Sequence, residues 1–209
     1  MPPLPSPLAP ILPWLDLFGI AVFAASGALT AATMRQTFVT AAFFAVVTGV
    51  GGGTIRDLLI GAPVAWVHHP WVAAICLAAA GVIWVTPARW WAGDGLDWLD
   101  AGGLAAYAVF GAAKALAFGV PPVPAALMGV LTACSGGILR DVLLGAPSIL
   151  MRPELYVTAA ALAAALYVGL VLAGVAWFAA AVVAAGSGFA LRAAAIRWKL
   201  ALPAYRARD

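Results

Sequence analysis

A sixteen-residue stretch that occurs twice constrains this chain more than any other feature. The first copy runs from Thr48 to Pro63 and the second from Thr132 to Pro147, with nine identical positions. Each copy holds a small-residue cluster and then an Arg-Asp pair: Gly51, Gly52, Gly53, Arg56 and Asp57 in the first, and Ser135, Gly136, Gly137, Arg140 and Asp141 in the second. Glycine frees the backbone, and a charge in hydrocarbon needs a partner or water. Both copies therefore predict a broken helix that holds something polar.

The surroundings of both copies are those of a membrane protein. The chain of 209 residues is 65% hydrophobic and only 9% charged, and its mean hydropathy is +1.04, whereas a soluble domain has about 25% charged residues. A membrane-spanning helix needs roughly 20 apolar residues, so the chain has room for about seven spans. Apolar runs bounded by Pro, Gly, Trp and charged residues predict helices over 14–34, 38–61, 70–87, 97–118, 122–145, 154–173 and 176–197.

The duplicated motif is the centre of a longer repeat. A constant offset of 84 residues pairs Asp16 with Asp100, as it pairs Arg56 with Arg140. Each unit contains three predicted spans, an odd number, so the second unit must enter the membrane from the opposite side. We therefore expect an all-α polytopic membrane protein built as an inverted 3+3 repeat plus one helix. The three parts are a first repeat over 14–87, a second, inverted repeat over 97–173, and a seventh helix with a basic tail over 176–209.

Basic residues alternate between the predicted connections. Arg35, Arg89 and Arg152 follow the first, third and fifth helices, whereas the other connections carry only His68 and His69. A basic cluster ends the chain: Arg192, Arg197, Lys199, Arg206 and Arg208. The positive-inside rule then predicts an inner-membrane protein with its N-terminus outside and its C-terminus cytoplasmic. The same positions favour contact of the tail with the lipid surface over a nucleic-acid partner.

Two interpretations of the Arg-Asp pairs remain open from the sequence. In the structural one, Arg56 and Arg140 bind carbonyls freed by the helix breaks, and the aspartates stabilise the N-termini of half-helices. In the second interpretation, ion pairs form between the repeats, Arg56 with Asp141 and Arg140 with Asp57, because neighbours at i and i+1 do not share a helix face. The glycines likewise allow either a break or close helix packing.

Lys114 is the only lysine before the C-terminal tail, and Thr30 occupies its equivalent position in the first repeat. One interpretation is a side chain that extends from a helix end to the headgroups. The other is a charge that faces a pore and responds to voltage.

The sequence indicates no enzyme, cofactor or metal site. It contains no Ser/His/Asp or Cys/His arrangement and no phosphate-binding or dinucleotide-binding motif. His68 and His69 are adjacent on a loop and form a weak ligand set. Cys76 and Cys134 lie in apolar runs and are expected to fill buried space.

The element Gly-Gly-x-x-Arg-Asp-x-Leu-x-Gly-Ala-Pro, at Gly52 to Pro63 and again at Gly136 to Pro147, resembles the bacterial branch of the trimeric intracellular cation channel family. That branch was earlier described as a glycine-transporter-like membrane domain. The resemblance implies a homotrimer with a potassium-permeable pore in each protomer, lined by helices 1, 2, 4 and 5 and kinked at the glycine motifs. It also implies a gating lysine on helix 4, which maps to Lys114. Ser135 replaces one of the three glycines in the second cluster, so the two kinks are not expected to be fully equivalent.

These observations favour a channel for potassium and other monovalent cations. Its polar lining would combine glycine carbonyls with the hydroxyls of Ser26, Thr48, Thr132 and Ser135. Cation passage beside basic residues requires that the arginines be neutralised. The alternative is an alternating-access carrier of a small zwitterion such as glycine, whose carboxylate would bind half-helix N-termini.

Overall fold

The computed structural model describes residues 12–91, 93–151 and 154–203, and this part of the chain is helical without strands. The α-helices are α1 (Leu12–Thr33), α2 (Phe38–Leu59), α3 (Ala65–His68), α4 (Pro70–Val85), α5 (Gly95–Ala117), α6 (Pro122–Leu143), α7 (Val157–Leu172) and α8 (Trp177–Trp198). Short 3-10 turns cover Ala88–Trp90 and Ile149–Met151. The seven long helices start and end within three residues of the predicted positions, whereas the four-residue α3 was not predicted.

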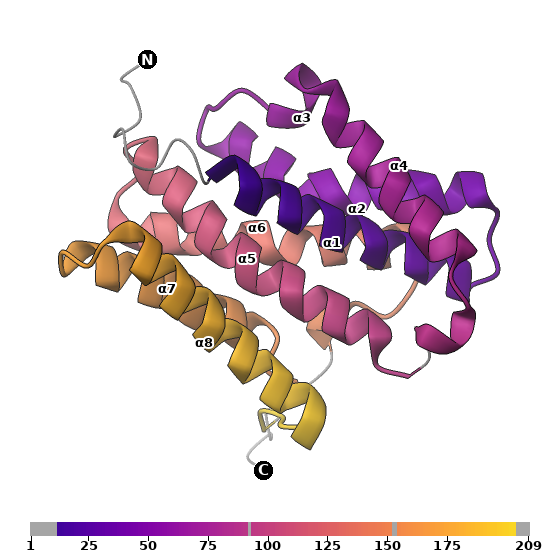
Figure 1. The fold of residues 1–209 in the computed structure, drawn as a ribbon. Coiled ribbons are helices and arrows are strands. Elements are labelled where there is room, and N and C mark those ends of the chain that lie inside the picture. Colours follow the sequence, from indigo (N-terminus) through magenta and orange to yellow (C-terminus); the bar gives the residue numbers. More distant parts are fainter. Residues whose placement is uncertain (1–11, 92, 152–153, 204–209) are drawn as a thin grey trace, which may run out of the picture.

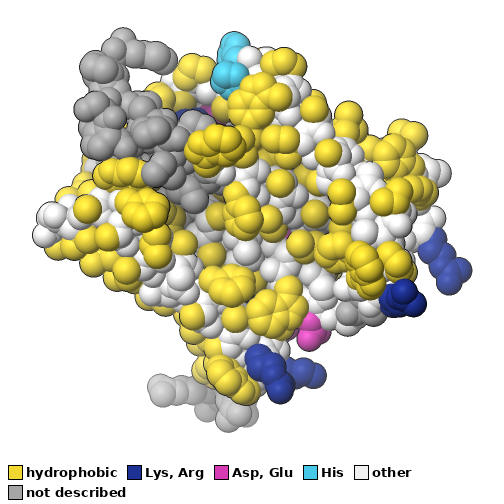
Figure 2. Space-filling view, viewed as in Figure 1, with side chains coloured by type: hydrophobic (Ala, Val, Ile, Leu, Met, Phe, Trp, Pro, Cys, Tyr) yellow, Lys and Arg dark blue, Asp and Glu magenta, His cyan; other side chains and the backbone are white. Residues whose placement is uncertain are grey.

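Among the described residues, four helices are long and apolar enough to cross a membrane: α1, α2, α6 and α8. The apolar helices α4 and α7 have 16 residues each, and α5 has 23 residues but carries three charged side chains. Apolar side chains cover most of the face in Figure 2, and the Lys and Arg side chains seen there lie at its edges. This distribution suits a lipid-embedded surface, because a soluble protein rarely exposes so large an apolar area.

The packing of the helices follows the repeat. In the first unit α1 packs against α2 and α4, and in the second α5 packs against α6 and α7. The units meet where α1 contacts α5 and α2 contacts α6, while α8 packs against α5 and α7. In Figure 1, α3 and α4 lie on one side of the central helices, and α7 and α8 lie on the other. The centre of α5 is buried on all faces, which matches its small and apolar residues.

The ends of α2 and α6 are alike because the repeated sequence ends both helices in the same way. Gly61 and Gly145 follow the C-terminal residues with φ angles of +67° and +64°. This left-handed conformation after a helix is the one that glycine adopts without strain. Each helix therefore stops at the same distance beyond its Arg-Asp pair.

The predicted helix breaks at the glycine clusters are wrong. Both α2 and α6 continue without interruption through the clusters to Leu59 and Leu143. The glycines permit close approach instead: a Cβ on Gly52 would collide with the carbonyl oxygen of Thr132. A Cβ on Gly136 would lie 2.6 Å from the carbonyl oxygen of Thr48. Of the two interpretations, close packing therefore explains these residues, and no half-helix is formed.

These contacts also fix the register of the α2–α6 crossing. Thr48 lies against Gly136, and Thr132 lies against Gly52. The repeat offset of 84 relates Thr48 to Thr132 and Gly52 to Gly136, so it converts one contact into the other. Thus α2 and α6 cross as an antiparallel pair about a local twofold relation.

Candidate functional site: two buried arginine clusters

The first Arg-Asp pair forms a buried cluster at the C-terminal end of α2, which we call the Arg56 cluster. Arg56 is 1% exposed, and its Nε and Nη2 atoms lie 2.8 and 2.7 Å from Oδ1 of its own neighbour Asp57. The ammonium of Lys114, on α5, lies 2.8 Å from the same oxygen. The guanidinium also lies 4.6 Å from the ring centre of Phe110, a cation–π contact. One carboxylate therefore holds two cations.

Lys114 does not extend to the headgroups, because its ammonium is bound to Asp57 inside the protein. Its side chain is only 16% exposed. The contact joins α5 of the second repeat to α2 of the first. It places the lysine beside a buried arginine, where the field of either charge acts on the other.

The second pair forms the Arg140 cluster, at the C-terminal end of α6. Nε of Arg140 donates to Asp141 Oδ1 at 2.8 Å, and Nη1 donates to Asp100 Oδ1 at 2.8 Å. Nη1 also contacts the hydroxyl of Ser26, which itself donates to Asp100 at 2.6 Å. Asp100 is fully buried, and Tyr156 donates to its second oxygen at 3.5 Å. Here two carboxylates hold one cation.

The predicted cross-pairs, Arg56 with Asp141 and Arg140 with Asp57, are wrong. Each arginine binds the aspartate next to it in sequence. The register of the α2–α6 crossing explains why: the two motifs lie on opposite sides of the crossing point. Arg56 and Asp141 are consequently displaced by roughly 20 Å along the helix axes, at 1.5 Å per residue. Each arginine is therefore paired with the aspartate of its own motif, while Lys114 shares Asp57 and Asp100 adds a second carboxylate to Arg140.

The aspartates also fasten the short segments that follow their helices. Asp57 Oδ2 accepts from the backbone N–H of Ala65, the first residue of α3, at 3.4 Å. Asp141 Oδ2 accepts from the N–H of Ile149, at the start of the second 3-10 turn, at 2.8 Å. The offset of 84 relates these two bonds. Each Arg-Asp pair thus links a helix end to the loop folded over it.

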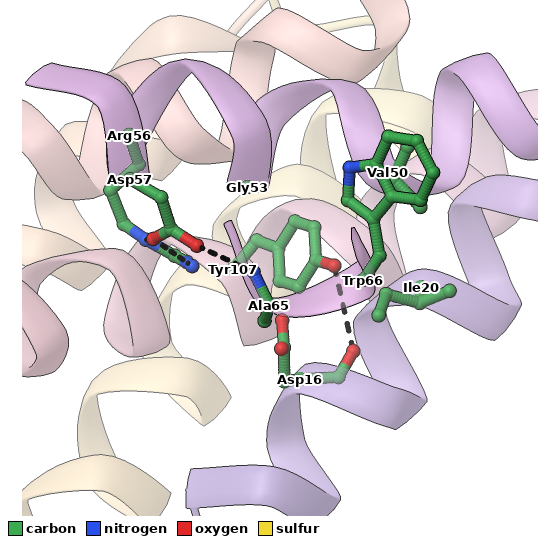
Figure 3. A pocket seen from close by; sticks show the side chains of 9 residues that line it. All are labelled: Asp16, Ile20, Val50, Gly53, Arg56, Asp57, Ala65, Trp66 and Tyr107. Atoms are coloured by element: carbon green, nitrogen blue, oxygen red, sulfur yellow. Dashed lines mark hydrogen bonds and ion pairs between the residues drawn. The ribbon is translucent and has the colours of Figure 1, made fainter. Parts of the chain in front are cut away.

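A small pocket lies beside the Arg56 cluster (Figure 3). It is lined by Asp16, Ile20, Val50, Gly53, Arg56, Asp57, Ala65, Trp66 and Tyr107. The indole N–H of Trp66 donates to Thr54 Oγ1 at 2.9 Å, which anchors α3 above the pocket. Tyr107 donates to the carbonyl oxygens of Gly49 and Asp16 at 3.3 and 3.5 Å. The room inside for a water-sized sphere is only about 10 Å³, which is about one water molecule.

The hydroxyls predicted to line a pathway are all buried near the helix crossing. Ser26 and Thr48 are 0% exposed, Thr132 is 1% and Ser135 is 7% exposed. Thr132 and Ser135 donate to carbonyls one turn back in α6, whereas Thr48 Oγ1 has no hydrogen-bond partner among the described residues. Thr48, Thr132 and Ser135 form the packed centre between the two clusters with Gly51, Gly52 and Gly136, whereas Ser26 and Gly137 lie at the Arg140 cluster and Gly53 lies at the Arg56 cluster.

Arg192 corrects the prediction that the basic tail lies at the lipid surface. Its side chain is fully buried, and Nη1 donates to Glu154 at 2.7 Å, while Nη2 lies 3.9 Å from Asp97. Its guanidinium lies 5.3 Å from the ring centre of Tyr156, whose hydroxyl reaches the Arg140 cluster. Arg197 and Lys199 are exposed as predicted, and Arg206 and Arg208 lie outside the described residues, as does Arg152.

The sequence pairs Asp16 with Asp100, but it did not predict that Asp100 binds Arg140 or that Asp16 lines the pocket beside Arg56. The offset of 84, which pairs them as it pairs the arginines, is the signal that connects them. Glu154 and Tyr156 carried no comparable signal. Within the described residues, no group of three or more His, Cys, Asp or Glu side chains could hold a metal ion.

Comparison with known proteins places this geometry in a known context. The family described as "Glycine transporter" matches twice, over residues 13–88 and 97–172. The UPF0126 inner membrane protein YadS of Escherichia coli is 38% identical over 92% of this chain and 95% of its own length. A UPF0126 membrane protein of Vibrio cholerae is 37% identical over 91% of this chain and 81% of its own length.

Solved structures of the same fold are also found. The TRIC trimeric intracellular cation channel orthologue from Rhodobacter sphaeroides is 41% identical, with a TM-score of 0.85 over 91% of this chain and 99% of that one. A prokaryotic TRIC channel crystallised in 0.5 M KCl is 26% identical, with a TM-score of 0.82 over 92% and 98% of the two chains. A trimeric intracellular cation channel from C. elegans, 15% identical with a TM-score of 0.63, shares the fold.

Proposed function

We propose a function for this chain, which belongs to the bacterial branch of the trimeric intracellular cation channel family. It is a homotrimeric channel of the inner membrane, and each protomer carries its own pathway for potassium and other monovalent cations. The pathway follows the interface between the repeats, where α1, α2, α5 and α6 meet.

The observation that carries this proposal is the pair of buried arginine clusters on either side of the α2–α6 crossing. Intramembrane charges are expensive and mark ion or substrate pathways. Here Arg56 and Arg140 are each bound to their neighbouring aspartates, so each guanidinium has a counter-charge, although Asp57 is shared with Lys114 and Arg140 binds Asp100 as well. The packed centre, with Gly52 against Thr132 and Gly136 against Thr48, is then the closed constriction between them.

The membrane topology belongs to the same proposal. Seven helices cross the bilayer as an inverted 3+3 repeat plus α8, with the N-terminus outside and the C-terminus cytoplasmic. The double match of the family, at 13–88 and 97–172, supports two related units. Exposed Arg35 and Arg89 support the cytoplasmic assignment of their loops.

A potassium flux assay tests the proposal. Proteoliposomes loaded with potassium are diluted into a potassium-free buffer with a proton ionophore, and the entry of protons that balances potassium efflux is followed with a pH-sensitive dye. We expect efflux well above that of empty liposomes, and we expect it to remain proportional to the potassium gradient up to high concentration. Efflux no faster than from empty liposomes would refute the proposal.

One observation favours a second candidate, an alternating-access carrier of a small zwitterion such as glycine. At the Arg56 cluster, Asp16 lines a pocket. At the Arg140 cluster the equivalent aspartate, Asp100, is bound to Arg140. The two ends of the protein therefore differ, as they would in a carrier that is accessible from one side. Counterflow of labelled glycine distinguishes the candidates. Accelerated, saturable exchange supports the carrier, and its absence together with potassium flux supports the channel.

A further inference from the structure

The two arginine clusters differ at one atom of the guanidinium. In the Arg140 cluster, Nη1 donates to Asp100 Oδ1 at 2.8 Å and also contacts the hydroxyl of Ser26. The residues equivalent to these two partners, at the offset of 84, are Asp16 and Phe110. Phe110 presents a ring in place of a hydroxyl, and Nη1 of Arg56 has no hydrogen-bond partner among the described residues.

Asp16 is the acceptor that this atom lacks. It lines the same pocket as Arg56 and Gly53, is only half-buried, and lies within electrostatic range of both Arg56 and Lys114. Figure 3 shows Asp16 and Arg56 on different sides of the pocket, with Tyr107 between them. Among the described residues the Asp16 carboxylate forms no ion pair with Arg56, whereas its repeat equivalent Asp100 binds Arg140 through both oxygens.

A buried N–H without a partner is unfavourable, so a reachable carboxylate gains free energy by moving onto it. Inverted repeats place equivalent residues in related positions about a pseudo-twofold axis. The arrangement of Arg140 and Asp100 is therefore a template for a second state of Arg56 and Asp16.

We propose that Asp16 is the switching partner of Arg56. In a second conformation the Asp16 carboxylate moves onto Nη1 of Arg56, as Asp100 does with Arg140, and this movement closes the pocket beneath Trp66. In the structure, Arg140 binds the α5 carboxylate Asp100, whereas Arg56 does not bind the equivalent α1 carboxylate, Asp16. For conduction, which rests on the proposed function, a cation passes this end only while Asp16 is away from Arg56.

The test measures access to the pocket and needs no transport activity. Gly53 is a suitable reporter position, because a Cβ there would meet only Arg56 Nη2, at 3.7 Å. Gly53→Cys is made with Cys76→Ala and Cys134→Ala, since the two native cysteines are free. The protein is placed in lipid nanodiscs, where both faces are accessible, and the rate of reaction with a neutral thiol reagent is recorded. A neutral reagent removes any direct effect of the Asp16 charge on its approach.

We expect Asp16→Asn to raise the modification rate, because it removes the carboxylate that occupies Arg56 Nη1 in the closed state; a closed state populated about four times as much as the open one gives a rise of about fivefold. Asp16→Glu, which keeps the charge, should return the rate towards that of the parent. Equal rates in the parent, Asp16→Asn and Asp16→Glu proteins would overturn the inference.

Size-exclusion profiles that match the parent establish that each variant is folded. If Asp16→Asn does not fold, an unchanged modification rate in Asp16→Ser overturns the inference equally. Potassium flux is measured separately, so failure of the switch and failure of the channel proposal are distinguishable.

Discussion

At the scale of residues, each arginine pairs with the aspartate next to it in the sequence and not with an aspartate of the other repeat. Neighbours at i and i+1 point away from each other at their Cβ atoms. That rule led the sequence reasoning to seek distant partners, but an arginine side chain is long enough to turn back to an adjacent carboxylate. The Nε–Oδ1 distance of 2.8 Å recurs in both clusters. Residue types and spacing therefore identified the charged groups, whereas side-chain conformation determined their pairing.

The aspartates equivalent in the two repeats should differ in their contribution to stability. Asp100 is fully buried against Arg140, whereas Asp16 is half-buried and unpaired with Arg56. Asp100→Asn removes one partner of a buried ion pair and should cost about 3 kcal/mol or more. Asp16→Asn should cost less than about 1 kcal/mol. Thermal unfolding of the solubilised proteins, followed by size-exclusion chromatography, measures the difference. Equal losses would contradict the assignment of the closed pair to Asp100.

Lys114 should influence conduction through its contact with Asp57. Lys114→Met leaves Asp57 with Arg56 alone and removes one charge from the end of the pathway. We expect an altered current–voltage relation, since a charge moving through 100 mV changes the energy by about 2.3 kcal/mol. Lys199→Met, at an exposed position beyond α8, is the matched control and should leave the relation unchanged. An unchanged relation in Lys114→Met would limit the lysine to a structural role.

At the scale of elements, the crossing of α2 and α6 could be only half predicted. The two glycine clusters at a constant offset identified these helices as the centre of the repeat. They did not show whether the helix backbones break at the glycines or continue through them. Local flexibility favoured a break, whereas the observed contacts with Thr48 and Thr132 show that tertiary packing decides. The register between the helices depends on this packing and is invisible in either helix alone. That missing register is also why the cross-pairs were expected.

Glycine substitutions at the crossing should separate packing from flexibility. Gly52→Ala and Gly136→Ala both place a methyl group against a backbone carbonyl, which cannot move as a side chain would. Overpacking of this kind costs about 1–3 kcal/mol. Gly81→Ala in α4 meets nothing within 4 Å and should be neutral or slightly stabilising. Thermal unfolding should show a decrease on the order of 5 °C for the crossing variants alone. A neutral Gly52→Ala would contradict the packing account.

The anchoring of α8 depends on Arg192 and not on the basic residues beyond it. Arg192 is buried and bound to Glu154, whereas Arg197, later in the same helix, is exposed. Arg192→Met should destabilise the protein by about 2–4 kcal/mol, because it leaves Glu154 and Asp97 without this cation. Arg197→Met should change stability by less than about 0.5 kcal/mol. Limited proteolysis of α8 in both variants checks the difference, and equal cleavage rates would exclude an anchoring role for Arg192.

At the scale of the whole molecule, composition and the residues that bound the apolar runs predicted the positions of the seven long helices to within three residues. Proline at the start of α4 and α6 and glycine after α2 and α6 mark helix ends by their own backbone preferences, so these ends were readable. The short α3 was not, because it exists through contacts: Asp57 binds Ala65, and Thr54 binds Trp66. Arg192 was misplaced for a similar reason: the basic residues that follow it, Arg197 and Lys199, are exposed, whereas Arg192 itself lies against the acidic residues Glu154 and Asp97.

Single-channel recording in planar bilayers measures directly whether the protein conducts cations. Purified protein is incorporated between solutions of unequal potassium concentration, with chloride as the common anion. We expect discrete current steps whose reversal potential lies close to the equilibrium potential of potassium. Steps that reverse near the chloride potential, or the absence of steps from protein that exchanges labelled glycine in liposomes, would contradict this expectation.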